Sequence, residues 1–372
     1  MLMTQNATAL DNELLKVSLS PIAALLDDPH VTDIMVFSSQ HVCVRGRRSG
    51  FERVPVFWLS EEDLMTAAKT IGRQMNRRLD HREPILDARL PDKSRVNVII
   101  DPCYNRGACI AIRKFPLDHF TWTDLVSFGS IDPAGVLMLE AIVRLGKNTL
   151  IAGGTGSGKT TLLNCLCSFI GDTNIVVTVE DAREIALQNE LWIALETKRA
   201  LDAEDRDVTL RDLVRTSLRM NPRWIIVGEV RGAEALDLVR AFNTGHYGAG
   251  TIHANSAYDA LLALESLILQ SGLDVPARAV KEMVSRAIQI VVQVNLLPDH
   301  SRKVVEIAKI QGLDYERSVE FPPYKLTTLY RFDFSHYDTS HKAYGNFLVR
   351  DAPSWLGDLK MIPGYQLPDF WV

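Results

Sequence analysis

The chain has 372 residues, of which 47% are hydrophobic and 23% charged, with a formal net charge of −5. That length favours two domains, and the composition is ordinary for a globular protein. We find neither a secretory signal nor a run of ~20 apolar residues that could cross a bilayer, so we expect a cytoplasmic protein with peripheral membrane contact at the inner membrane at most.

Charge argues against a general nucleic-acid surface. Residues 1–118 carry a net charge of +1 and residues 119–372 a net charge of −6, which together give the −5 of the whole chain. A duplex-binding domain usually has a strong basic excess. The basic clusters at 45–48 and 73–82 favour a solvated face, with docking to acidic lipid or a partner as the alternative. We expect no specific nucleic-acid partner.

Residues 1–118 are expected to form a smaller mixed α+β domain, with residues 1–20 as a flexible, polar leader. Alternating apolar and polar side chains predict half-buried strands in four places, which pair as two hairpins. These are residues 32–37, 41–45, 94–101 and 109–115. Ser60, followed by acidic residues, predicts the start of a helix.

Residues 119–135 are expected to be a linker, because Pro116 and Pro133 mark breaks in the pattern. Over residues 136–372, apolar strands alternate with helical stretches, which predicts an α/β domain with a mostly parallel sheet and helices on both faces. Its predicted strands include residues 148–153, 174–181, 224–229 and 290–296. From about residue 321, 12 of the 28 aromatic residues predict an extension that wraps the core or makes a subunit contact.

The stretch GGTGSGKTT has the spacing of a phosphate-binding P-loop, and it follows a predicted strand and opens a predicted helix. Its glycines let backbone N–H groups point at one phosphate, and the helix N-terminus adds partial positive charge. Lys159 is expected to contact the outer phosphates of ATP, and the Thr160 hydroxyl to bind Mg²⁺. The predicted binding residues are Gly153, Gly154, Thr155, Gly156, Ser157, Gly158, Lys159, Thr160 and Thr161.

Hydrolysis also needs a carboxylate that orients or deprotonates the attacking water. One apolar strand ends in Glu180 and Asp181, and another in Glu229, where Gly228 stands in the place that many such enzymes give to an aspartate. Two acid-terminated strands behind one P-loop favour a shared active site. Solvated strand ends or helix caps are the alternative.

Two histidines follow in a glycine-rich stretch. The glycines make a continuous helix improbable, so we expect a loop that enters a short strand ending near His253, after His246. Such a histidine could report the γ-phosphate to a neighbouring subunit. A structural role is the alternative.

The order of four motifs resembles the secretion (traffic) ATPases of type II and type IV secretion, pilus assembly and conjugation, over roughly residues 20–350. GGTGSGKTT resembles their Walker A motif, VTVEDAREI their Asp box, IIVGEVRG their Walker B motif and TGHYGAGTIHANS their His box. The resemblance implies a RecA-like domain. Because Walker B in this family ends in Gly-Glu, it assigns water activation to Glu229. It assigns an assisting place near the metal, through water, to Glu180, and a catalytic place to His253.

The upstream segments ILDARLPDKSRVNVII and CIAIRKF resemble the N-terminal domain of the branch that holds tight-adherence pilus ATPases and conjugal-transfer ATPases. In that branch, arginines matching Arg95 and Arg113 reach the nucleotide phosphates. A positive charge supplied there would stabilise phosphoryl transfer. Ordinary surface arginines are the alternative.

The resemblance implies an Mg²⁺-dependent ATPase in a homohexameric ring that acts on an inner-membrane platform or a secretion channel. Tight-adherence pilus assembly is the first choice, and a conjugal-transfer or type IV secretion ATPase is the alternative. Two other classes stay open: an ATP-binding regulator or scaffold with little hydrolysis, and a nucleic-acid motor.

Overall fold

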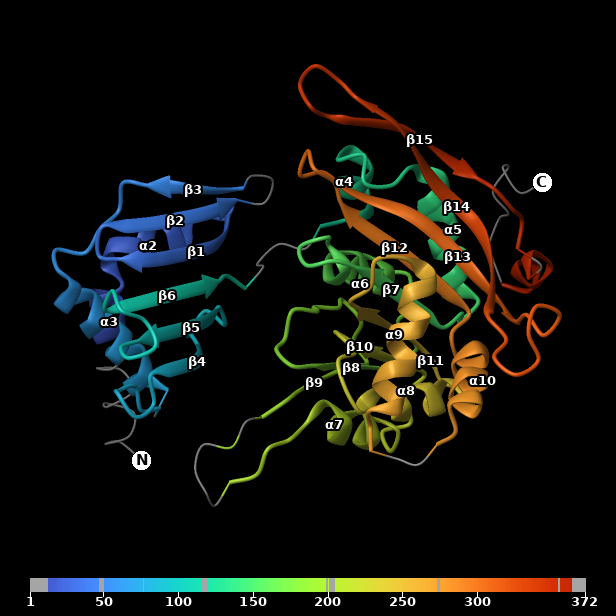
Figure 1. Ribbon diagram of the computed structural model, residues 1–372, viewed down its shortest axis with the longest axis horizontal. Coiled ribbons are helices and arrows are strands. Elements are labelled where there is room, and N and C mark those ends of the chain that lie inside the picture. Colours follow the sequence, from blue (N-terminus) through green and yellow to red (C-terminus); the bar gives the residue numbers. More distant parts are fainter. Residues whose placement is uncertain are drawn as a thin grey trace. The chain divides into compact units, whose positions relative to one another are not determined.

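The computed structural model describes residues 13–46, 50–75, 77–115, 120–198, 200, 205–272, 275–353 and 355–362. The chain divides into two compact units, residues 1–118 and 119–372 (Figure 1). Each unit has its own buried apolar core.

The first unit is built on a six-stranded antiparallel sheet in the order β3-β2-β1-β6-β5-β4. Its strands are β1 (Val31–Ser38), β2 (His41–Gly46), β3 (Phe51–Val54), β4 (Ile85–Arg89), β5 (Arg95–Ile100) and β6 (Ala108–Arg113). The two predicted hairpins are confirmed as β1–β2 and β5–β6, and pairing of β1 with β6 joins them. The edge strands β3 and β4 escaped prediction because they are short and show no clear alternation of buried and exposed residues.

One long helix, α3 (Glu61–Gln74), packs on this sheet. Its predicted start is confirmed, since the Ser60 side chain accepts a hydrogen bond from the Asp63 backbone N–H at 3.1 Å. Leu64, Ala67 and Ile71 recur at helical spacing and are fully buried in the core of the first unit.

The structure differs from the predicted leader over residues 1–20. Residues 13–18 are helical, and Leu15 and Leu19 are each only 4% exposed within the core of the first unit. The Trp58 indole N–H donates to the Ser18 carbonyl at 3.1 Å, and η1 (Ser20–Ile22) and α2 (Ala23–Asp27) follow. Two leucines four residues apart bury one helical face, whereas the neighbouring apolar residues Leu14 and Val17 are 51% and 70% exposed, which blurs the helical pattern in the sequence. Residues 1–12 of the predicted leader lie outside the described residues.

The second unit is an α/β domain around a nine-stranded sheet in the order β15-β14-β13-β12-β7-β11-β10-β8-β9. The strands from β12 to β9 are parallel, and β13, β14 and β15 add antiparallel strands at one side. The bounds are β7 (Thr149–Gly153), β8 (Val176–Glu180), β9 (Trp192–Glu196), β10 (Trp224–Val227), β11 (Tyr247–Ile252), β12 (Ile290–Leu296), β13 (Arg302–Leu313), β14 (Tyr324–Tyr337) and β15 (Ala343–Val349).

Helices cover both faces of this sheet, as predicted (Figure 1). One face packs against α7 (Leu210–Ser217), α8 (Glu234–Asn243), α9 (Ala257–Leu269) and α10 (Ala277–Ala287), and the other against α5 (Pro133–Arg144) and α6 (Lys159–Cys167). Successive strand residues alternate between the two cores, so Leu150 and Ala152 enter one core and Ile151 the other. Burial on both faces explains why these strands read as continuous apolar runs.

The segment predicted as a linker belongs instead to the core of the second unit. It contains α4 (Trp122–Ser127), which Thr121 and Asp124 cap reciprocally, and α5 begins already at Pro133. Leu125 and Ile131 are buried against α5 and α6. Residues 116–119 lie outside the described residues.

Most of the aromatic residues beyond 321 that the structure describes lie in strands β14 and β15. Tyr330 of β14 stacks on Phe347 of β15 with ring centroids 5.6 Å apart. Both rings pack in the apolar core that the sheet shares with α5 and α6. The Tyr330 hydroxyl also donates to the Asp132 carboxylate at 2.8 Å, at the start of α5. The chain then forms η2 (Leu356–Met361), and residues 363–372 lie outside the described residues.

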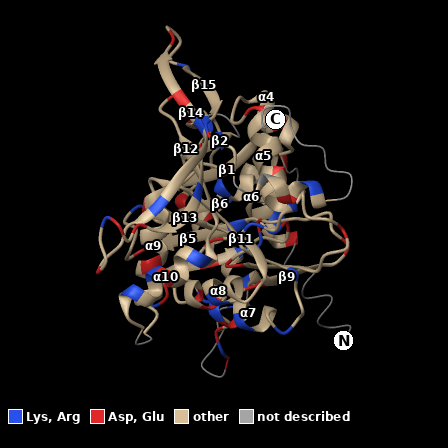
Figure 2. Ribbon diagram, turned by 90° about the vertical axis from the view of Figure 1, so that its right-hand side faces the viewer, with Lys and Arg blue, Asp and Glu red and all other residues tan. Residues whose placement is uncertain are grey.

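Within the described residues, none of the helices has the length and apolar character needed to cross a membrane. Figure 2 shows basic and acidic residues interspersed along the ribbon in this view.

Candidate functional site

The P-loop connects β7 to α6, as the motif requires. Gly156 (φ 73°) and Gly158 (φ 96°) adopt left-handed backbone conformations that favour glycine. A Cβ at Gly153 would collide with the Val294 carbonyl oxygen of the neighbouring strand β12 and with Ser157. The glycines therefore let the loop turn tightly between the sheet and the helix N-terminus.

The P-loop contains both exposed and buried residues. Gly154, Thr155 and Gly156 are exposed, whereas Ser157 is buried and its hydroxyl donates to the Gly154 carbonyl at 2.9 Å. From β13, the Arg302 side chain donates to the Gly156 carbonyl at 2.9 Å, a brace that the sequence did not reveal.

Lys159 is 8% exposed, and its ammonium donates to the carbonyls of Gly153 at 3.0 Å and Gly154 at 2.9 Å. Burial lowers the pKa of Lys159, while the charge of Glu229 raises it and that of Arg231 lowers it. Both side chains at the end of β10 therefore act electrostatically on the P-loop lysine.

Parallel pairing brings the acid-terminated strands to the same edge of the sheet. The order β7-β11-β10-β8 puts the ends of β8 and β10 side by side, with β11 between β10 and the P-loop strand and β8 one strand further away. The end of β10 is fixed on both sides, because Gly228 N–H donates to the Val179 carbonyl at 2.9 Å and Thr251 donates to the Gly228 carbonyl at 2.6 Å.

Glu229 follows directly, with a side chain 19% exposed. One carboxylate oxygen, Oε1, lies 3.1 Å from Nε2 of His253, and the other, Oε2, accepts a hydrogen bond from the Arg231 guanidinium. The structure thus places Glu229 beside His253 and Arg231 at the edge of the sheet where β7 enters the P-loop.

Glu180 is 3% exposed at the end of β8. Its Oε1 accepts hydrogen bonds from the backbone N–H groups of Glu184 at 2.9 Å and Ile185 at 3.0 Å. Its side chain also crosses Gly228, where a Cβ would lie 2.9 Å from the Glu180 Cγ. Glycine before Glu229 is therefore the residue that leaves room for the acid of the neighbouring strand.

The two histidines do not lie together. His253 follows the carboxyl end of β11 beside Glu229, with a side chain 51% exposed. His246 precedes β11, where its Nδ1 lies 3.2 Å from the Ala241 carbonyl oxygen. Their separation by a whole strand leaves only His253 at the P-loop edge of the sheet.

Arg231 was not predicted as a site residue, and Asp181 was named only as one of the two acids that end its strand. The Arg231 guanidinium contacts the Glu229 carboxylate, and its Nη1 lies 3.4 Å from Oδ2 of Asp181. The hydrogen bond to Glu229 raises the pKa of Arg231, and the charges of Glu229 and Asp181 add to that effect against the opposing effect of burial. The available signal was the two-residue spacing from Glu229, which in an extended chain puts two side chains on one side.

Arg95 and Arg113 both belong to the first unit, where they are directly opposite each other on β5 and β6. The Arg113 Nε lies 3.2 Å from Oδ1 of Asp33, which also pairs with Arg45 at 2.7 Å. Burial acts to raise the pKa of Asp33, but hydrogen bonds from Thr32 and Arg45, with the charges of Arg45 and Arg113, hold it below its ordinary value. The predicted reach of the two arginines to nucleotide phosphates stays a prediction.

The donor set at the P-loop fits a nucleotide with Mg²⁺. The loop presents backbone N–H groups at the start of α6 together with the Lys159 ammonium, which suits an anionic phosphate chain. Thr160, half-buried in the first turn of α6, would hold the metal by its hydroxyl, and Thr161 stands beside it. Glu180 would bind a water of the metal shell.

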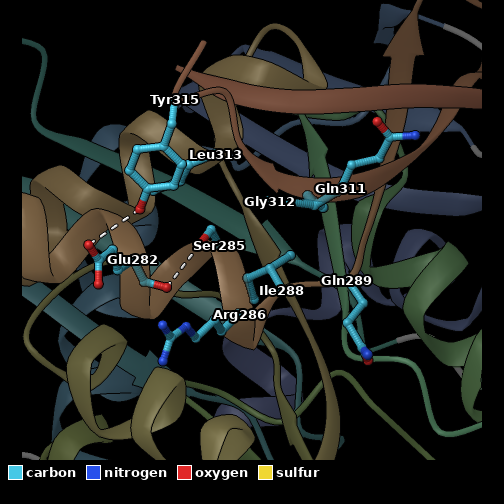
Figure 3. Close-up of a pocket in the computed structure, with 10 residues that line it drawn as sticks. Glu282, Ser285, Arg286, Ile288, Gln289, Gln311, Gly312, Leu313 and Tyr315 are labelled. Atoms are coloured by element: carbon cyan, nitrogen blue, oxygen red, sulfur yellow. Dashed lines mark hydrogen bonds between the residues drawn. The ribbon is translucent and has the colours of Figure 1, made fainter. Parts of the chain in front are cut away.

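A separate pocket of about 380 Å³ lies between α10 and β13 (Figure 3). Tyr315 donates to Glu282 across it at 3.4 Å, and Ile288 and Gln289 line it just before β12 begins. Since β12 and β7 are parallel, the pocket is at the amino ends of these strands, at the opposite edge of the sheet from the P-loop. It is not part of the candidate nucleotide site.

Comparison with known proteins gives consistent matches. The family described as Type II/IV secretion system protein matches residues 16–322. A "Putative conjugal transfer protein" of Mycobacterium tuberculosis is 33% identical over 294 residues, covering 77% of this chain and 83% of the relative. The Type IV secretion system protein VirB11 of Bartonella quintana is 28% identical over 332 residues, covering 78% and 92%. The X-ray structure of the Legionella pneumophila ATPase DotB has the same fold, with a TM-score of 0.57, 20% identity and coverage of 76% and 77%.

Proposed function

The chain belongs to the type II/IV secretion system protein family and has its RecA-like fold, and from this premise we propose that it is an ATPase of a conjugal-transfer or type IV secretion machine. The observation that carries the proposal is the position of Glu229. It follows a strand next but one to the P-loop strand, at the same edge of the parallel sheet as the P-loop. A P-loop with a carboxylate in this place is what hydrolysis of a bound triphosphate needs.

In the proposed reaction, the P-loop backbone and Lys159 bind the phosphates, and Glu229 accepts a proton from the attacking water. The new bond forms between water oxygen and the terminal phosphorus, while the bond to the bridging oxygen of ADP breaks. His253 orients the Glu229 carboxylate through its contact at 3.1 Å. Bound Mg²⁺ would neutralise developing phosphate charge, held by Thr160 and, through water, by Glu180.

Arg95 and Arg113 remain proposed contributors to turnover. Either guanidinium would add a fixed positive charge that stabilises the transferred phosphoryl group. Arg113 already pairs with Asp33, so such a role would require its side chain to leave or share that partner.

The choice of machine changes relative to the expectation from sequence. Tight-adherence pilus assembly was the first choice, but the relatives reported above carry conjugal-transfer and type IV secretion names, which support the alternative. On this proposal the chain acts as a homohexameric ring at the cytoplasmic face of the inner membrane. Its partners are the proteins of a secretion channel or platform.

The test is phosphate release from ATP by the purified full-length chain, with and without Mg²⁺. We expect Mg²⁺-dependent turnover that Lys159→Ala abolishes, because that change removes the ammonium held beside Gly153 and Gly154. A matched control is Lys309→Ala, a strand lysine on β13 outside the site, which should leave turnover unchanged. Nucleotide binding without turnover by the wild-type chain would instead support the regulator or scaffold.

A further inference from the structure

Neither carboxylate oxygen of Glu229 is open to water, because Oε2 is hydrogen-bonded and Oε1 is buried without a hydrogen-bond partner among the described residues. Oε2 accepts a hydrogen bond from the Arg231 guanidinium, and Oε1 lies 3.1 Å from the His253 ring. A general base needs an oxygen within hydrogen-bond reach of the water whose proton it takes. In this arrangement one of the two oxygens must therefore be uncovered before Glu229 can act on water.

Arg231 has a second acceptor within reach. Its Nη1 lies 3.4 Å from Oδ2 of Asp181, beyond a good hydrogen bond but close enough that a small side-chain movement would complete one. The side chains of Arg231 and Asp181 are 57% and 43% exposed, which leaves them room to move. The guanidinium carries several donors in a planar fork, so it can leave one carboxylate as it binds another.

The backbone around Arg231, by contrast, is fixed. The buried Glu234 carboxylate accepts the N–H of Arg231 at 2.6 Å and the N–H of Gly232 at 2.8 Å. Any movement of the guanidinium is therefore a side-chain movement about a fixed Cα, between the end of β10 and the end of β8.

Deprotonation cannot release Glu229 from Arg231. Arginine stays charged in proteins, and the hydrogen bond to Glu229, with the surrounding acids, raises the pKa of Arg231 further. Exchange of partners is the remaining route.

We propose that Arg231 is a positioning residue that exchanges between Glu229 and Asp181. On Glu229 it withholds the carboxylate from water, and on Asp181 it leaves Oε2 free to accept the proton. This inference rests on the proposed ATPase function. Asp181 then binds the Arg231 guanidinium while ATP is hydrolysed.

A first experiment tests whether Arg231 changes partners and does not require hydrolysis. The full chain is crystallised with Mg²⁺ and a non-hydrolysable ATP analogue. We expect the Arg231 guanidinium on Asp181 and absent from Glu229 Oε2. A guanidinium still bound to Glu229 in that complex overturns the proposal, whether or not the chain hydrolyses ATP.

A second experiment measures kcat and KM for MgATP in a double-mutant cycle. Asp181→Asn removes the alternative acceptor, so we expect kcat to fall about tenfold with KM changed less than about twofold. Arg231→Gln in the same chain removes the group that withholds Glu229, and kcat should rise about fivefold or more above that of Asp181→Asn alone.

Two other outcomes are decisive. A double variant no faster than Asp181→Asn overturns the exchange and leaves a merely structural ion pair. Arg144→Gln, which removes the exposed pair with Glu140 on α5, is the matched control and should not change kcat. If the wild-type chain shows no turnover, the proposed function fails, and the crystal experiment alone decides the exchange.

Discussion

At the scale of single residues, Gly228 shows how a missing acid can be informative. The Glu180 side chain crosses the space that a side chain at 228 would fill, with the Glu180 Cγ 2.9 Å from the position of a Cβ. Two backbone N–H groups hold Glu180 in that place. Because Glu180 occupies this space, position 228 on the neighbouring strand must be glycine. The carboxylate of that strand therefore lies one residue later, at Glu229.

Gly228→Ala should lower kcat more than it weakens nucleotide binding, because the methyl group displaces Glu180 and the start of the Glu229 loop. Overpacking of this kind destabilises a protein by ~1–3 kcal/mol. Stopped-flow binding, phosphate release and thermal unfolding measure the three effects. Gly50→Ala is the control, since a Cβ there meets nothing within 4 Å. Equal behaviour of the two variants would show that Gly228 is not needed for this packing.

Part of the candidate site could be predicted at this scale. The P-loop and the two acids could be predicted from the sequence because each belongs to a short motif where a strand meets the loop that follows it. Arg231 was not, because its role depends on carboxylates from two strands, Glu229 after β10 and Asp181 after β8. Such partnerships follow from strand order, which no local pattern contains.

At the scale of elements, strand β14 holds the start of helix α5. The Tyr330 hydroxyl of β14 donates to Asp132 at 2.8 Å, and Asp132 in turn accepts the Gly135 N–H at the start of α5. Tyr330 is fully buried, so this hydrogen bond links two elements far apart in the sequence inside the core. It makes β14 part of the fold of the second unit.

Tyr330→Phe removes this hydrogen bond and keeps the ring stack on Phe347. We expect a loss of ~1 kcal/mol in the free energy of unfolding, because a buried hydrogen bond of this kind contributes about that much. Chemical denaturation monitored by circular dichroism measures it. Tyr344→Phe, on an exposed ring of β15, is the control and should be neutral. A neutral Tyr330→Phe would contradict the proposed link.

The sequence predicted the parallel strands well and the segments around them less well. Strands buried on both faces read as apolar runs, whereas edge strands such as β3 lack any clear pattern. The expected linker and leader failed for a related reason. Single buried residues such as Leu15 and Leu125 attach short helices to a core, and so few buried positions do not form a clear periodic pattern.

At the scale of the whole molecule, the charge of the chain argues against a nucleic-acid motor. The net charge is −5, and acidic and basic residues are interspersed along the chain (Figure 2). Binding to duplex DNA draws most of its free energy from a basic surface that neutralises phosphates.

Duplex DNA should therefore leave phosphate release unchanged within about twofold at low salt, where electrostatic binding is strongest. Phosphate release at 50 mM and 200 mM salt, with and without DNA, measures this. Stimulation that disappears at the higher salt would instead revive the nucleic-acid motor. Polyglutamate of matched charge serves as the control for non-specific polyanion effects.

The most direct test of the account compares Glu229→Gln with the wild-type chain for ATP binding and for phosphate release. The amide keeps the size of the side chain but cannot accept the proton of water, so nucleotide affinity should be retained while kcat falls by ~10²-fold or more. Undiminished phosphate release by Glu229→Gln would contradict the assignment of Glu229 as the base.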